Sequence, residues 1–161
     1  MIQLIENALP KEINQKLNHL CLKDHDFPFF YVKGVANKED TDFFFMHLLY
    51  NKGKVNSVYF NEVSLPLLGL IKYSKLMRLK INCYPRQSKP IVNSFHVDSD
   101  DSHMVALYSI NDNNGYTEFE NGEKFISKAN QLLIFDGKMK HRSISQTDTN
   151  LRLNININYV V

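Results

Sequence analysis

Residues 151–160 read LRLNININYV, and polar and apolar side chains alternate at every position from Leu151 to Tyr159. Strict alternation is typical of a β-strand with one polar and one apolar face. Residues 78–84, RLKINCY, follow the same rule. Two such strands predict a sheet whose apolar face lies on a core and whose other face is polar.

The chain from Met77 onward consists of short runs of Val, Ile, Leu, Tyr and Phe, separated about every ten residues by turn-forming residues. This pattern predicts an antiparallel sandwich or barrel. The expected strands are 76–84, 93–97, 104–110, 117–120, 124–127, 131–135, 142–146 and 151–160. Ahead of them we expect helices at 10–21 and 65–76 and strands at 27–32 and 43–50, the last of which could also be helical. The predicted fold class is α+β, mainly β, with helices buttressing one face of a β double layer.

Length and composition fit one soluble domain spanning residues 1–161, with 43% hydrophobic residues. The 19 Lys and Arg against 17 Asp and Glu give a net charge of +2, too small to indicate a nucleic-acid or membrane partner. Cys21 and Cys83 are too few for a disulfide framework or a zinc site, so we expect reduced, buried thiols. Because no leader pattern and no apolar run of about 18 residues occurs, we expect a cytoplasmic protein without a membrane partner.

Three residues are candidates for a metal site. His96 and Asp98 lie two apart on the expected strand 93–97, so both side chains should point to one face. His141 follows 45 residues later (141 minus 96). Two imidazoles and one carboxylate form the facial triad of non-heme Fe(II) oxygenases. A His-x-Asp pair alone also arises by chance, and His103 is a competing ligand, although we expect it to be a solvated loop residue. The remaining histidines, expected to be structural or exposed, are His19, His25 and His47.

Arg152 lies on the polar face of the strand 151–160, with Asn154, Asn156 and Asn158. One interpretation is an edge strand whose polar face is in water. The other places this face inside the barrel, where Arg152 would grip a carboxylate. Tyr84, on the second polar face, could donate its hydroxyl to the same ligand or simply pack at the strand end before Pro85.

From Met77 onward the sequence resembles the prolyl 4-hydroxylase branch of the 2-oxoglutarate oxygenases, including short phage-encoded members. The segments that carry the resemblance are CYP (83–85), HVD (96–98), ALYSIN (106–111), NNGYT (113–117), LLIF (132–135), His141 and Arg152. The resemblance implies a double-stranded β-helix, or jelly roll, with N-terminal helices packed outside the larger sheet. It assigns iron binding to His96, Asp98 and His141, and 2-oxoglutarate binding to Arg152, Tyr84 and Asn156.

The resemblance also implies the activity: Fe(II) with 2-oxoglutarate and O2 as cosubstrates, ascorbate as a further candidate cofactor, and a prolyl residue in a peptide or protein as substrate. Asp98 indicates hydroxylation, because halogenating relatives have a small residue in its place. Ser109 departs from the family pattern, since many relatives have a second tyrosine there that reaches the carboxylate, and this leaves Arg152 with fewer helpers.

Other interpretations stay open at this point. An oxygenase acting on nucleic acid or on a free amino acid would share the triad, and a metal-free jelly-roll binding module would share the strands. The segments 35–58 and 85–94 are expected to contact the substrate, because loops on a rigid scaffold usually carry specificity.

Overall fold

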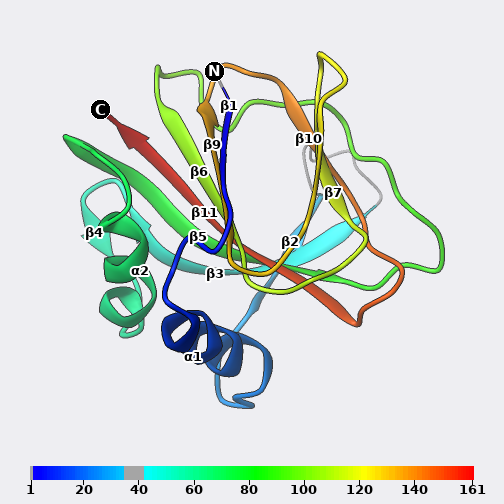
Figure 1. The fold of residues 1–161 in the computed structure, drawn as a ribbon, viewed down its shortest axis with the longest axis horizontal. Coiled ribbons are helices and arrows are strands. Elements are labelled where there is room, and N and C mark those ends of the chain that lie inside the picture. The colour runs from blue at the N-terminus through cyan, green and yellow to red at the C-terminus, as the bar shows by residue number, and fades with distance from the viewer. Residues whose placement is uncertain (1, 35–41) are drawn as a thin grey trace.

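The computed structural model describes residues 2–34 and 42–161 of the chain. A larger and a smaller antiparallel sheet lie opposite each other, and two helices cover the outer face of the larger one (Figure 1). The helices are α1 (Lys11–Leu22) and α2 (Phe60–Leu68). The strands are β1 (Ile2–Ile5), β2 (Phe30–Lys33), β3 (Phe43–Asn51), β4 (Lys54–Val55), β5 (Lys75–Pro85), β6 (Met104–Ser109), β7 (Tyr116–Phe119), β8 (Lys124–Ile126), β9 (Gln131–Asp136), β10 (His141–Ile144) and β11 (Leu151–Val160).

The larger sheet has the strand order β1-β9-β6-β11-β5-β3-β2, with β4 paired to β3, and the smaller sheet has the order β10-β7-β8. Strand β11 therefore lies in the middle of the larger sheet, between β6 and β5. The interpretation of residues 151–160 as an edge strand with its polar face in water is wrong. Both faces of β11 are buried, the apolar one against the helices and the polar one between the two sheets.

Two apolar clusters enclose this polar interior. The larger cluster joins the helices to the outer face of the sheet, for example Leu17 and Leu67 to Leu79 and Ile155. The smaller cluster fills one part of the space between the sheets and consists of Val105, Phe119, Leu133 and Phe135. The rest of that space is left for the polar faces of β5 and β11, which are paired residue by residue: Tyr84 opposite Arg152, Asn82 opposite Asn154, Lys80 opposite Asn156 and Arg78 opposite Asn158.

Most predicted strands and the first helix are confirmed, but four expectations need correction. Residues 93–97 form no strand and make only single bridges to β10, so His96 lies on an irregular segment. The second helix spans Phe60–Leu68 instead of 65–76, because it ends at Gly69 and the chain then enters β5. The strand expected at 27–32 begins only at Phe30, after a turn in which the Phe27 amide bonds to Asp24. Strand β1 was not predicted.

The segment 35–58, expected to contact the substrate, is largely strand β3, and its residues 35–41 lie outside the described ranges. Neither of the described helices has the length and apolar character needed to cross a membrane. Cys21 and Cys83 are buried free thiols, as predicted.

Candidate metal and carboxylate site

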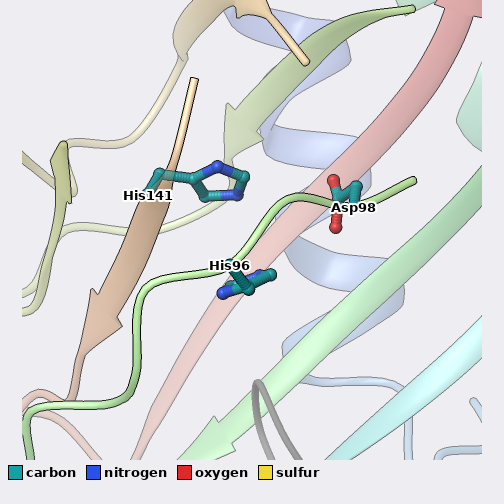
Figure 2. Close-up of side chains that lie close together, drawn as sticks. All are labelled: His96, Asp98 and His141. Carbon is teal, nitrogen blue, oxygen red and sulfur yellow. The ribbon is translucent and has the colours of Figure 1, made fainter. Parts of the chain in front are cut away.

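His96, Asp98 and His141 come together at the polar end of the space between the sheets. One ligand-type atom from each of the three lies within 4.8 Å of the others. Figure 2 shows His141 on β10 and His96 and Asp98 on the segment that leads from β5 to β6. The backbones of His96 and His141 hold the two chains in register through a reciprocal pair of 3.0 Å hydrogen bonds. This pair, rather than a regular strand, sets the position of His96.

The two imidazoles are oriented for metal binding. Nδ1 of His141 lies 3.1 Å from the carbonyl oxygen of Met139. A carbonyl can only accept, so Nδ1 carries the proton and Nε2 keeps a lone pair. Burial, and then the neighbouring His96, lower the pKa of His141, which favours the neutral imidazole. In His96, Nδ1 lies 3.4 Å from the Ser94 carbonyl oxygen, in the same relation.

Asp98 is held by an unusually complete set of donors. Its Oδ1 lies 3.1 Å from Nη2 of Arg78, and its Oδ2 accepts hydrogen bonds from Asn156 at 3.0 Å and Asn158 at 2.9 Å. Burial alone would raise the pKa of Asp98, but Arg78, Lys80 and the two amides hold it well below its usual range. The group is therefore a carboxylate anion at any ordinary pH.

Arg152 lies at the opposite end of the same polar region and is only 2% exposed. Its Nε donates to the Ser127 hydroxyl (2.9 Å), and its Nη1 donates to the Ser143 hydroxyl (2.7 Å) and the Ile144 carbonyl (3.1 Å). Nη2 has only a 3.4 Å contact, to the Thr117 hydroxyl. Burial lowers its pKa, but a guanidinium stays charged in a protein.

No carboxylate of residues 2–34 or 42–161 lies within 4.0 Å of the Arg152 nitrogens. A buried cation without an anionic partner is costly. The arrangement is therefore suited to a carboxylate that arrives from outside the protein.

A cavity of about 210 Å³ connects the two ends, and its lining includes His96, Asp98, His141, Tyr84 and Arg152. Cavities that bind small ligands typically enclose a few hundred Å³ and carry a few convergent polar groups. The cavity is thus of the size and polarity for a metal ion with a small dicarboxylic acid.

Tyr84 lines the cavity between the two ends. Its ring stacks on Phe44 with centroids 5.3 Å apart and lies 5.5 Å from the Arg152 guanidinium carbon. Burial raises the pKa of Tyr84 to about 12, so the phenol keeps its proton and can donate it in a hydrogen bond. Asn156 also lines the cavity, but its amide nitrogen is used by Asp98, and its Oδ1 is buried without a partner.

The expectation that His103 is solvated is wrong. Its side chain is 4% exposed, its Nδ1 lies 2.7 Å from the Asp101 carbonyl oxygen, and its ring packs on Gly137. It does not belong to the His96–Asp98–His141 group. His47 is buried between Pro28 and Ser57, while His19 and His25 are exposed.

Several residues of the site were not identified from the sequence. The hydroxyls that hold Arg152 come from Thr117, Ser127 and Ser143, and Ser109 is not among its hydrogen-bond partners in the described chain. A weak signal existed for two of them, because Thr117 and Ser143 are small polar residues on predicted strands, and they pair directly. The contact of Arg78 with Asp98 had no local signal.

No protein-family model matches the sequence, and no curated protein matches it. Solved structures do match in fold. A 2OG-Fe(II) oxygenase family oxidoreductase from Burkholderia pseudomallei aligns at a TM-score of 0.73 and 12% identity, covering 99% of this chain and 84% of that one. A prolyl hydroxylase from Trichoplax adhaerens, in complex with a hypoxia inducible factor peptide fragment, aligns at 0.71 and 14%, covering 99% and 83%.

The non-heme alpha ketoglutarate dependent epimerase SnoN from nogalamycin biosynthesis aligns at a TM-score of 0.69 and 12% identity, covering 99% of this chain and 77% of that one. At these identities the likeness concerns the fold. The mainly β jelly roll predicted from the sequence is thereby confirmed: this chain has the fold of the 2-oxoglutarate and iron(II) oxygenases.

Proposed function

We propose that this protein is an Fe(II)- and 2-oxoglutarate-dependent oxygenase that hydroxylates its substrate. The observation that carries the proposal is one cavity with two ends: a His96–Asp98–His141 donor set at one end and the unpaired, buried Arg152 at the other. A metal-free binding module has no use for either. The jelly-roll neighbours add support, since their names state the same cofactors.

The donor set fits ferrous iron. Two neutral imidazoles and one carboxylate on one side of a metal leave three positions open, as in non-heme iron oxygenases. Iron in this position supplies oxygen activation coupled to the oxidative decarboxylation of 2-oxoglutarate to succinate. The chain's own contribution is orientation: Asn156 and Asn158 fix Asp98, and Met139 fixes the tautomer of His141.

Arg152 provides the second point of attachment for 2-oxoglutarate. Its Nη2 faces the cavity with free N–H groups, so we assign it the distal carboxylate. Tyr84, protonated and beside Arg152, is placed to donate to an oxygen of the same ligand. Two fixed ends leave the cosubstrate little freedom, and a fixed orientation is the main contribution that a protein makes to cofactor chemistry.

For the substrate we propose first the prolyl residue of a peptide, because a neighbour of the same fold is described in complex with a peptide fragment. The epimerase among the neighbours was solved with nogalamycin RO, a small molecule, so the fold also accepts substrates other than peptides. Hydroxylation of the substrate adds the mass of one oxygen atom, which mass spectrometry detects after incubation with Fe(II), 2-oxoglutarate and ascorbate.

The test of the proposed activity needs no substrate. Purified protein with Fe(II), 2-oxoglutarate and O2 should form succinate slowly, and omission of iron should stop it. His141→Ala should form none, whereas His25→Ala, which changes an exposed histidine outside the donor set, should behave like the wild type. Equal succinate formation by His141→Ala and the wild type would contradict the proposal.

A further inference from the structure

A second cation without an acidic partner lies in the cavity, at the metal end. Lys80 on β5 lines the cavity directly across from Asn156. Its ammonium lies 5.5 Å from the centre of the Phe44 ring. No carboxylate in the described parts of the chain lies within 4.0 Å of it.

The neighbours of Lys80 increase its need for an anion. Arg78, two residues away on the same face of β5, already pairs with Asp98. Burial, and then Arg78, lower the pKa of Lys80 to about 8, although Asp98 opposes this shift. This is the direction expected for an ammonium group that faces more positive than negative charge.

Charge counting shows that iron and 2-oxoglutarate do not remove the excess. Arg142, which also lines the cavity, is paired with Glu118. The other lining cations are Arg78, Lys80 and Arg152, against the single carboxylate of Asp98. Because Fe(II) and the 2-oxoglutarate dianion cancel each other, the loaded cavity still holds two more positive than negative charges.

We propose that Lys80 is a second carboxylate-binding position, beside the metal and separate from Arg152, and that it binds a carboxylate of the substrate. The inference rests on the proposed function. It narrows the substrate class to molecules with a carboxylate within a few bonds of the reacting carbon, such as a free amino acid. The interior of a peptide chain, whose carbonyls are amides, lacks that group unless an acidic side chain supplies it.

The same chemistry could come from the metal-proximal carboxylate of 2-oxoglutarate. We favour the substrate because the proximal carboxylate is neutralised by direct contact with the metal, and Lys80 stays unpaired in the charge count. The two sources separate experimentally, since one predicts an effect of Lys80 on 2-oxoglutarate binding and the other does not.

The experiment uses Mn(II) in place of iron, without O2, with saturating 2-oxoglutarate and acetate as the carboxylate probe. Paramagnetic Mn(II) enhances the relaxation of the acetate methyl protons only when acetate is bound nearby. Lys80→Met should weaken acetate binding at least about tenfold, the loss expected for one charge-assisted hydrogen bond. Lys80→Arg should retain binding. Lys75→Met, which removes an exposed lysine from the same strand, should match the wild type, and acetamide should show no dependence on Lys80.

Three results would overturn the inference. Acetate binding that is absent in the wild type, or equal in Lys80→Met, would remove the position. Weaker 2-oxoglutarate binding by Lys80→Met would assign Lys80 to the cosubstrate. Failure of the wild type to bind 2-oxoglutarate at all would instead refute the proposed function, and acetate binding to the Mn(II) protein would still test Lys80 by itself.

Discussion

Removal of the charge of Arg152 should cost most of the affinity for 2-oxoglutarate. Of the five N–H groups of the guanidinium, the one on Nε and both on Nη1 already have acceptors within 3.1 Å. The two on Nη2 remain for the cosubstrate, apart from the 3.4 Å contact with Thr117. One charge-assisted hydrogen bond contributes about 1.5–3 kcal/mol, so Arg152→Met should weaken 2-oxoglutarate binding by about 10- to 150-fold.

Arg152→Lys keeps a charge but loses the planar fork and cannot make the three short hydrogen bonds that position the guanidinium. We therefore expect weaker 2-oxoglutarate binding by this variant as well. Arg142→Met is the matched control, because Arg142 lines the same cavity but is already paired with Glu118. Its affinity for 2-oxoglutarate should stay close to that of the wild type.

Anaerobic calorimetry with Mn(II) in place of iron measures these affinities without turnover. The affinity for Mn(II) itself should barely change in any Arg152 variant, since Arg152 contacts none of the three metal-site residues. If Arg152→Met bound 2-oxoglutarate as tightly as the wild type, Arg152 would not be the anchor, and Lys80 would become the next candidate.

Metal binding, folding and pH stability depend on other side chains. His141→Ala should abolish Mn(II) binding in a paramagnetic resonance titration but leave the protein folded, because the backbone of β10 makes the strand pairing; wild-type metal affinity would remove His141 from the site. Asn158→Ala removes the 2.9 Å hydrogen bond to the Asp98 carboxylate and should lower metal affinity about 10- to 100-fold in the same titration. Gly137→Ala places a methyl group against the ring of His103 and should lower the free energy of unfolding in urea by about 1–3 kcal/mol; the double variant with His103→Ala should recover most of this loss, and strictly additive losses would count against the contact. Lys80, with its pKa lowered from 10.5 to about 8, binds its proton less tightly in the folded than in the unfolded chain. The free energy of unfolding should therefore rise from pH 8 to about 10, and Lys80→Met should not show this rise.

The polar interior could be predicted from the sequence because it is written in a local pattern. Alternation in residues 78–84 and 151–160 assigns each side chain to a face, and the pairing of β5 with β11 brings the two polar faces together. The choice between water and barrel interior for that face was open, because burial depends on strand order. The central position of β11 decides it.

The failures concern contacts between distant parts of the chain. The pattern around His96 suggested a strand, but only single bridges to β10 form there. His103 is buried because Gly137, 34 positions later (137 minus 103), leaves room for its ring. The hydroxyl groups around Arg152 come from three separate segments that meet only when the smaller sheet forms. None of these relations leaves a periodic signal.

The most direct test of the central claim is a crystal structure of the protein grown without O2 in the presence of Mn(II) and 2-oxoglutarate, with the metal placed by anomalous scattering. We predict one metal ion bound by His96, Asp98 and His141, with the distal carboxylate of 2-oxoglutarate on Nη2 of Arg152. A metal ion bound by other residues, or a distal carboxylate bound away from Arg152, would contradict the account.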